Sequence, residues 1–390
     1  MKHLLIFAAV VLSFSASALP LNDTPESIVT QILDNNTDIR ALKASSLAEI
    51  REVKNNASDF EPTQFEYEHL FARHSSKWNI GVSQAFKWPS VYRAIRSEAA
   101  NRTSAMQYLL DAKRIEIASE AYRDLEMLDF IKCRISLLDS VDNNLASLQK
   151  YVNDGYNGGQ LTILDVKKIT LERYRLSAQI ADLKAEALTY SADLEALNNG
   201  PLDLSDVSFN IPMLLPLDDY ISYATENNPE IIADRYLAAA AADNAAAQRN
   251  YPGFSVGYRH AYEENTHFNG FSLGISLPVF SRKKTMDVAR LQAEAIAENT
   301  LTTRSRLTAD IRAAHAEATA RLAQLKNLSQ FTLVENYPDL ILMAYKGGQI
   351  NVITYIQELN YYLNAQMDLL AARHAYKTAA LALIPHTPRP

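Results

Sequence analysis

Most of the chain carries apolar residues at helical spacing, and two short stretches interrupt this pattern with strict alternation. Residues 25–58 have the helical spacing, and Pro25 suits a first turn. Residues 62–88 and 252–279 instead alternate apolar and polar side chains, which predicts two antiparallel strand hairpins, the second with its turn at residues 264–267. Strands of about ten residues with one apolar face are typical of outer-membrane barrels, although a soluble antiparallel sheet alternates in the same way.

A pair of glycines occurs twice at the end of a helical stretch. Tyr156 begins the first copy, Tyr-Asn-Gly-Gly-Gln-Leu, and Tyr345 begins the second, Tyr-Lys-Gly-Gly-Gln-Ile. Glycine supplies the left-handed backbone that ends a helix, so each copy predicts the tip of an antiparallel helical hairpin. Further landmarks recur in the same order, for example residues 35–39 and 227–231. The chain is therefore interpreted as a duplicated unit.

The helical stretches before the two tips are unusually long. Residues 90–154 contain neither Pro nor Gly, and residues 281–346 contain only Pro338, where a kink is expected. Helices of this length favour coiled-coil packing. Return helices are expected at residues 160–198 and 349–384.

The repeat and its flanks divide the chain into segments. The division is a signal peptide at 1–18, a first repeat at 19–200, a connector at 201–216 and a second repeat at 217–386. Each repeat contains a helix, a strand hairpin and a coiled-coil hairpin, the last at 90–199 and at 281–385. The signal peptide is indicated by Lys2, an apolar run to Phe14, and Ala16-Ser17-Ala18 before a cleavage site. The mature chain is therefore expected to be exported. No later apolar run reaches the length of a spanning helix, so it is not expected to be held by a transmembrane helix.

Composition excludes some functions. With 48% hydrophobic residues in 390 the chain can bury a large core, and its net charge of −7 comes without the basic patch that nucleic-acid binding requires. The one cysteine, Cys133, lies in a helical pattern and is expected to pack as a small apolar residue. Charged residues at 102–134 and 290–321 are interpreted as solvated coiled-coil faces, some of which line a lumen.

Candidate chemistry is sparse. Four histidines on or beside the strand hairpins offer imidazole to a transition metal: His69, His74, His260 and His267. No tight ligand spacing accompanies them, so solvated histidine is the favoured interpretation, and no metal or other cofactor is predicted. No Ser-His-Asp arrangement or carboxylate pair is placed as a catalytic site would need, so the protein is not expected to be an enzyme.

The strands constrain the assembly. Two hairpins per chain cannot close a barrel, and each unpaired backbone group at an open edge in lipid costs several kcal/mol. Three copies would close a barrel of twelve strands. The predicted fold class is therefore mainly α with a membrane β-barrel portion: four barrel strands and two long coiled-coil hairpins per chain, in a trimer whose barrel continues into an α-helical tunnel.

Together these features resemble the TolC family of outer-membrane efflux proteins, over essentially the whole mature chain. Residues 81–86, followed by Arg93, resemble the strand-to-helix junction of the CzcC-like heavy-metal efflux branch, although residues 90–93 replace the usual Gly-Lys-Arg. The resemblance implies a homotrimeric channel in the outer membrane of a Gram-negative bacterium, with its helical part in the periplasm. Such a channel passes small solutes, metal ions or drugs, from an inner-membrane transporter (RND type favoured) and a periplasmic adaptor to the exterior.

The same resemblance assigns site residues. The tips match the adaptor-docking surface: Gly155, Tyr156, Gly158, Gly159, Gln160, Leu161, Lys346, Gly347, Gly348, Gln349 and Ile350. Asp165 and Tyr345 match an entrance latch, and Thr354, Gln357 and Glu358 line the entrance. The family's basic latch partner falls on Ile350, and its acidic ring falls on Thr354 and Gln357. The closed entrance is therefore expected to depend on hydrogen bonds and packing.

Two alternatives stay open at this point. A type I protein-secretion duct uses the same fold, and no sequence feature here separates it from a channel for small solutes. An exported structural coiled-coil protein without a channel belongs to another class and predicts extraction without detergent. Outer-membrane lipid is a partner in the channel interpretation only.

Overall fold

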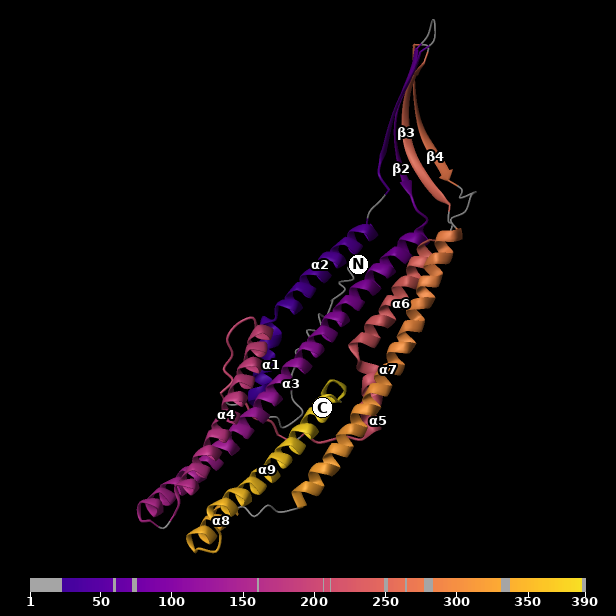
Figure 1. Ribbon diagram of the computed structural model, residues 1–390. Coiled ribbons are helices and arrows are strands. Elements are labelled where there is room, and N and C mark those ends of the chain that lie inside the picture. Colours follow the sequence, from indigo (N-terminus) through magenta and orange to yellow (C-terminus); the bar gives the residue numbers. More distant parts are fainter. Residues whose placement is uncertain are drawn as a thin grey trace, which may run out of the picture. The chain divides into compact units, whose positions relative to one another are not determined.

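The computed structural model describes most of the chain (Figure 1). The described residues are 23–58, 61–71, 76–159, 161–205, 207–210, 212–248, 252–263, 265–276, 283–330 and 337–387. The expected signal peptide, His74 and Gln160 lie outside these ranges.

Helices and strands appear in a matching order in the two halves of the chain. The first half contains α1 (Asp23–Asn35), α2 (Thr37–Ser58), β1 (Gln64–Phe71), β2 (Ser76–Phe86), α3 (Pro89–Asn157) and α4 (Ile163–Asn198). The second half contains α5 (Leu217–Asn227), α6 (Pro229–Ala247), β3 (Gly253–Glu263), β4 (Thr266–Ser276), α7 (Lys283–Gln330), α8 (Tyr337–Lys346), α9 (Val352–Leu381) and the short 3-10 helix η1 (Ile384–His386). The predicted combination of long helices with a small antiparallel sheet is confirmed.

The prediction of one helix over residues 25–58 is wrong, because α1 and α2 are separated at Asn36. This residue is only 3% exposed, and its side-chain amide donates a hydrogen bond of 2.9 Å to the carbonyl of Leu197 on α4. In the second half, Asn228 caps α6 by accepting from the backbone N–H of Ile231 at 3.1 Å. The repeated asparagines thus mark helix breaks, since their side chains bond in ways that compete with a continuing helix.

The kink predicted at Pro338 is not tested, because residues 331–336 before it lie outside the described residues. Helix α7 ends at Gln330, α8 begins at Tyr337, and Pro338 occupies the first turn of α8. A proline fits there because the first backbone N–H groups of a helix have no partner within the helix. The return helices α4 and α9 begin a few residues later than predicted, since Thr162 and Asn351 cap them with their side chains.

The described chain forms two compact units that do not follow the sequence repeats. The first unit comprises Met1–Thr37, Glu116–Tyr223 and Ile311–Pro390, and the second comprises Asp38–Ile115 and Ala224–Asp310. Each unit takes residues from both halves, and α3 and α7 contribute to both units. The repeat boundaries remain an interpretation of the sequence.

The core of the first unit is a set of apolar residues at coiled-coil spacing. It is formed by α3, α4, α8 and α9, with fully buried members Leu145, Leu148, Val152, Ile169, Leu176 and Tyr355. Helices of this kind are stabilised by packing of the apolar stripe rather than by local propensity. No helix among the described residues has both the length and the apolar character that crossing a membrane requires.

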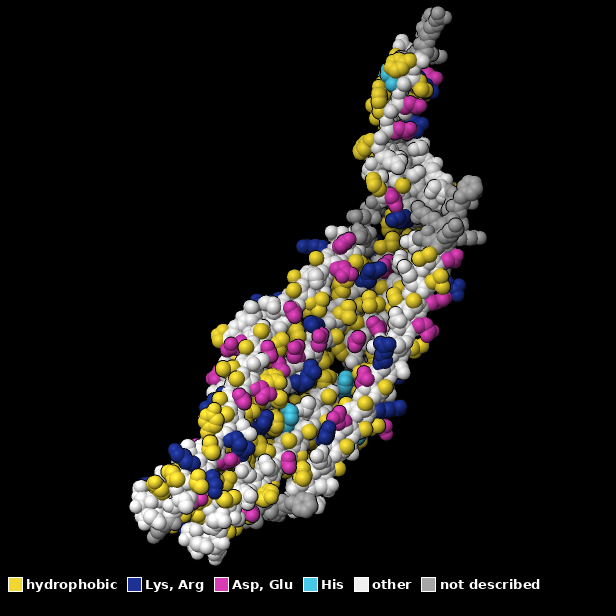
Figure 2. All heavy atoms as spheres, in the orientation of Figure 1, with side chains coloured by type: hydrophobic (Ala, Val, Ile, Leu, Met, Phe, Trp, Pro, Cys, Tyr) yellow, Lys and Arg dark blue, Asp and Glu magenta, His cyan; other side chains and the backbone are white. Residues whose placement is uncertain are grey.

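The second unit contains one antiparallel sheet in the order β1-β2-β3-β4. Its register gathers the alternating apolar residues on a single face, as predicted: Tyr67 pairs with Ile80, Val82 with Tyr258, and Tyr258 with Phe271. This apolar face is solvent-exposed in the single chain, with Phe271 at 86% and Leu273 at 83%. Figure 2 shows hydrophobic side chains along the strands.

The opposite face of the sheet is polar. Arg259 Nη2 lies 3.1 Å from Glu66 Oε2, and the Asn79 amide donates to Glu68 at 2.6 Å. The predicted turn at residues 264–267 is too long, because Glu263 pairs directly with Thr266. Asn265 takes the left-handed backbone with φ 66°, which asparagine tolerates better than most residues.

Candidate functional site

The two helical tips have the same backbone hydrogen bonds. In the first tip, Gly158 N donates to Asp154 O at 3.0 Å, and Gly159 N donates to Tyr156 O at 3.0 Å. In the second tip, Gly347 N donates to Met343 O at 2.9 Å, and Gly348 N donates to Tyr345 O at 3.0 Å. The second glycine of each pair has a positive φ, 74° at Gly159 and 69° at Gly348. The predicted helix ends at the Gly-Gly pairs are therefore confirmed.

Both tips present polar backbone to solvent above a half-buried apolar residue. Gly158 and Gly159 are exposed, as are the matching Gly347 and Gly348. Tyr156, Lys346 and Gln349 are exposed too, whereas Tyr345, which matches Tyr156, is buried. Leu161 and Ile350 are half-buried and pack on the core of the first unit. Gly155 leaves room for this packing, because a Cβ there would lie 2.8 Å from Leu161 Cδ1 and the leucine side chain would have to shift. The tips thus combine a rigid base with accessible backbone groups.

Asp165, assigned to the entrance latch, is engaged within its own helix. Its carboxylate accepts from the Thr162 hydroxyl at 2.7 Å and from the Thr162 backbone N–H at 3.2 Å, which completes a capping box. The Thr162 hydroxyl, followed by its N–H and then Lys168, lowers the pKa of Asp165 below the usual value for an aspartate. The carboxylate therefore stays ionised at neutral pH.

Tyr345, the other latch residue, is 7% exposed and lies among aromatic rings. Its ring centroid is 5.8 Å from that of Tyr151 and 5.9 Å from that of Tyr355. Burial raises the pKa of Tyr345, and the neighbouring Tyr151 and Asp165 raise it further. The two latch residues are close enough to interact electrostatically, and the latch itself stays a prediction.

The entrance-lining residues lie in the first turns of α9. The Thr354 N–H donates to the Asn351 side chain at 3.0 Å, and Gln357 is exposed. Glu358 accepts from the Tyr337 hydroxyl at 2.6 Å, which joins α9 to α8. Of these three residues only Glu358 is acidic, and its carboxylate already accepts a hydrogen bond from Tyr337 of the same chain. Their role at the entrance stays a prediction.

Channel conductance tests the latch. Tyr345→Phe keeps the aromatic packing and removes only the hydroxyl, whereas Asp165→Ala removes the carboxylate. If the two groups hold the entrance together, each substitution should raise single-channel conductance in planar bilayers, and the double variant should add little to either. Thr162→Val is the control for the helix cap, since it removes the Thr162 hydroxyl that caps α4 and keeps the Asp165 carboxylate. Unchanged conductance in both single variants would rule the latch out.

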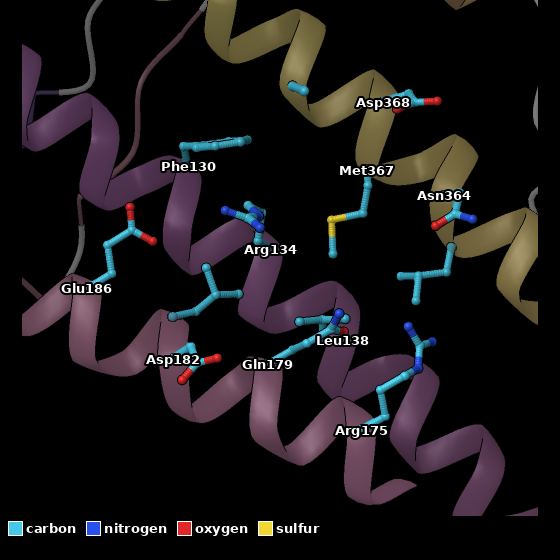
Figure 3. Close-up of a pocket in the computed structure, with 13 residues that line it drawn as sticks. Phe130, Arg134, Leu138, Arg175, Gln179, Asp182, Glu186, Asn364, Met367 and Asp368 are labelled. Atoms are coloured by element: carbon cyan, nitrogen blue, oxygen red, sulfur yellow. The ribbon is translucent and has the colours of Figure 1, made fainter. Parts of the chain in front are cut away.

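A groove of about 470 Å³ lies in the first unit, between α4 and α9 and over α3. Figure 3 shows its labelled side chains, with Arg134 from α3, Asp182 and Glu186 from α4, and Asp368 from α9. The lining mixes both signs of charge with the apolar Leu138 and Met367. Its charged groups favour a hydrated space between helices over an apolar ligand pocket.

Two buried carboxylates of α3 contact basic side chains of α9, one of them in an ion pair with a lysine, and the sequence pattern did not reveal them. Lys377 Nζ lies 2.8 Å from Asp129 Oδ2, and His374 Nδ1 lies 2.6 Å from Glu126 Oε2. Glu126 is 1% exposed and Asp129 is 7% exposed, so interpreting the charged residues of this region as solvated is wrong for both. The prediction that Cys133 is packed is also wrong: it is exposed, beside Asp129. The Lys377 ammonium group offsets the cost of burying the Asp129 carboxylate.

Asp124 on α3 gives a pH-dependent prediction. Burial, followed by repulsion from Glu120 and Asp193, raises the pKa of Asp124 to about 6. A raised carboxylate pKa means that stability is highest below the unfolded pKa of about 3.9 and falls as the pH rises to about 6. Asp124→Asn should therefore stabilise the protein at pH 7.5, by roughly 1 kcal/mol after allowance for solvent screening, and not at pH 4.

Thermal unfolding of the purified protein at the two pH values measures this gain. Asp139→Asn, which changes an exposed carboxylate on the same helix, should alter the Tm little at either pH. An equal gain for Asp124→Asn at pH 4 and pH 7.5 would contradict the assigned titration.

Solved structures with the same fold include membrane channels and an outer membrane protein. CusC, described in terms of transmembrane channel formation, matches with a TM-score of 0.74 and 12% identity, covering 94% of this chain and 92% of that one. The outer-membrane channel OprN matches with 0.72 and 15%, covering 94% and 90%. The outer membrane protein VceC from Vibrio cholerae matches with 0.72 and 14%, covering 93% and 96%.

No family model matches the chain, and no curated protein matches it either. The structural matches nevertheless extend over nearly the full length of both chains in each comparison. The chain therefore has the TolC-like fold of outer-membrane channels. These matches do not distinguish the CzcC-like branch from other channels of this fold.

Proposed function

We propose that the protein is the outer-membrane channel of a tripartite efflux pump, passing small solutes to the exterior. The observation that carries the proposal is the full-length likeness to outer-membrane channels, since it includes both the helices and the four-stranded sheet. The chain would act as a homotrimer in the outer membrane of a Gram-negative bacterium, with its helices in the periplasm. An inner-membrane transporter, for which the RND type is favoured, would supply the energy.

The two faces of the sheet support a place in the membrane. A strand that lines a membrane barrel turns apolar side chains to lipid and polar ones to the interior. Phe65, Phe271 and Leu273 would contact lipid, and they are all more than 80% exposed in the single chain. Glu66 and Arg259 on the other face would line the lumen. Strands β1 and β4, at the two ends of the sheet order, would pair with β4 and β1 of sister copies.

Helix α4 supports assembly from several copies in another way. Opposite its buried stripe it carries a second stripe at coiled-coil spacing, which is exposed in the single chain: Leu164, Leu171, Tyr174, Ala178, Ala181, Ala185 and Leu188. Tyr174 is 75% exposed and Leu188 is 71% exposed. An apolar stripe on both sides of one helix fits a wall of helices in which each has two neighbours. Helices of a sister copy would cover the second stripe.

The two Gly-Gly tips are the proposed contact for the periplasmic adaptor. They expose backbone groups and Lys346 on a base fixed by Leu161 and Ile350. A rigid surface of this kind limits the entropy lost on binding. The adaptor would therefore recognise backbone shape at the tips more than a particular charge.

Planar-bilayer recording of the purified mature protein tests the proposal. Detergent-extracted trimers should insert and give discrete conductance steps. A protein that extracts without detergent, stays monomeric and never inserts would instead support the structural coiled-coil alternative. Deleting the gene separates the two kinds of cargo: efflux predicts higher sensitivity to metals or drugs, whereas a type I secretion duct predicts loss of a secreted protein.

A further inference from the structure

Two histidines of the β3–β4 hairpin lie side by side on the apolar face of the sheet. His260 pairs with Asn269 across the hairpin, and Tyr262 pairs with His267, so the two imidazoles occupy diagonal positions on one face. His260 Nε2 and His267 Nδ1 are 3.3 Å apart, and the ring centroids are 5.3 Å apart. In Figure 2 histidine and hydrophobic side chains lie together on the strands. The hairpin thus brings two nitrogen ligands to one point.

The neighbouring Asn269 orients the first of these rings. Its Oδ1 lies 2.7 Å from His260 Nδ1 and also accepts from the Tyr258 hydroxyl at 2.8 Å. A carbonyl oxygen can only accept, so His260 carries its proton on Nδ1 and has a lone pair on Nε2, directed toward His267. Histidines that bind metals usually donate their other ring N–H to an oxygen in this way. His260 is therefore held in the tautomer that a metal requires.

The separation of the nitrogens fits one metal ion. Two imidazole nitrogens at about 2.0–2.1 Å from one ion lie about 3.3–3.4 Å apart at a tetrahedral angle and about 2.9 Å apart in the tetragonal geometry that copper(II) prefers. The observed separation matches the first, and a movement of about 0.4 Å gives the second. We propose that His260 and His267 form a binding site for a divalent transition metal, with copper(II) bound most tightly. To bind, His267 would place its proton on Nε2 and turn Nδ1 toward the ion, and its exposed ring leaves room for that rotation.

The ligand set determines which ion is preferred. Among the residues that the structure describes, no group of three or more His, Cys, Asp and Glu side chains is placed to hold a metal. Both histidines lie toward the turn end of the hairpin, nearer to the turn than Phe271 and Leu273, so water rather than lipid completes the coordination there and the site is open. Copper(II) forms stronger complexes with imidazole than nickel(II) or zinc(II) does, so it should win in direct competition. The site rests on the hairpin alone and does not depend on the proposed channel function.

The hairpin also contains a reporter for the metal. The ring centroid of Trp78 on β2 lies 5.4 Å from that of His260 and 6.4 Å from that of His267. The chain has two tryptophans, so Trp88→Phe leaves Trp78 as the one source of tryptophan fluorescence. A paramagnetic copper ion at this distance quenches indole emission strongly. Copper(II) should therefore quench the detergent-solubilised full-length Trp88→Phe protein in a saturable manner, and a chelator should reverse it.

Substitutions locate the site. In the Trp88→Phe background, His267→Ala should move half-maximal quenching to copper concentrations at least tenfold higher, and Asn269→Ala should weaken binding by about 10–100-fold. His69→Ala is the matched control. His69 lies on the same face opposite Trp78, with two strands between it and His267, so its loss should leave the titration unchanged.

Electron paramagnetic resonance of copper(II) on the Trp88→Phe protein gives a second readout that needs no further variant. The spectrum is expected to show coupling of the copper(II) electron spin to two imidazole nitrogens. Coupling to one nitrogen or none would overturn the proposal. Two quenching results would also overturn it. One is quenching of His267→Ala at the same copper concentrations as the Trp88→Phe protein, once heat-modifiable mobility has shown that the variant is folded. The other is loss of quenching in His69→Ala.

Discussion

If the protein assembles in the outer membrane as proposed, a Phe271→Arg variant should lose most of its folded trimer from that membrane, whereas Phe268→Arg should keep it. Phe271 is 86% exposed on the apolar face of β4, beside Tyr258 at a ring distance of 5.7 Å. An arginine facing lipid costs about 2–4 kcal/mol at the middle of the bilayer. Phe268 is 53% exposed on the opposite, polar face, where water would solvate the new charge.

The pair is closely matched because both variants change phenylalanine to arginine within three residues of one strand. Heat-modifiable mobility in gels and the amount of protein in isolated outer membranes measure the outcome. A larger loss of folded trimer for Phe268→Arg would mean that the polar face, not the apolar one, meets lipid. Equally small losses for both variants would contradict placing either face against lipid.

A Lys377→Met variant should lower the free energy of unfolding by about 3–5 kcal/mol, because it leaves the Asp129 carboxylate buried without its cation. The two side chains are 14% and 10% exposed, and their charged atoms are 2.8 Å apart. Methionine fills a similar volume, so the loss reflects the unpaired charge rather than a cavity. Denaturant unfolding of the purified protein, followed through the helical signal, measures the change.

The double variant Lys377→Met, Asp129→Leu should recover most of this loss, since a buried ion pair replaced by apolar residues is often neutral or stabilising. Lys326→Met changes a lysine on α7 and serves as a control for the loss of one positive charge. If the double variant were as unstable as Lys377→Met alone, the carboxylate would not be the cause of the instability.

Local patterns in the sequence predicted the parts of the structure that depend on neighbouring residues. The Gly-Gly pairs marked both tips because only glycine readily takes the φ of 74° and 69° found at Gly159 and Gly348. Alternation from Phe254 to Tyr258 identified the apolar face of β3, because successive side chains of a strand point to opposite faces. Such features need no knowledge of distant contacts.

Features that depend on distant partners were missed. Asn36 breaks a helical pattern because its amide bonds Leu197, which is 161 positions away in the chain. Asp129 and Lys377 are 248 positions apart in the chain, and Glu126 and His374 are similarly distant, so single-helix periodicity could not separate these carboxylates from solvated ones. His260 and His267 are seven residues apart with no ligand motif, and the register of the hairpin brings them together.

Disulfide cross-linking between the two outer strands tests most directly whether sister copies complete the sheet. In a Cys133→Ser background, which removes the one native cysteine, Tyr67→Cys on β1 is combined in turn with cysteine at 271, 273 or 275 on β4. Adjacent strands bring Cα atoms within the 4.4–6.8 Å that a disulfide needs. The proposed assembly predicts a covalent trimer on non-reducing gels at one of these registers. Monomer alone at all three positions, in protein extracted from intact outer membranes, would contradict it.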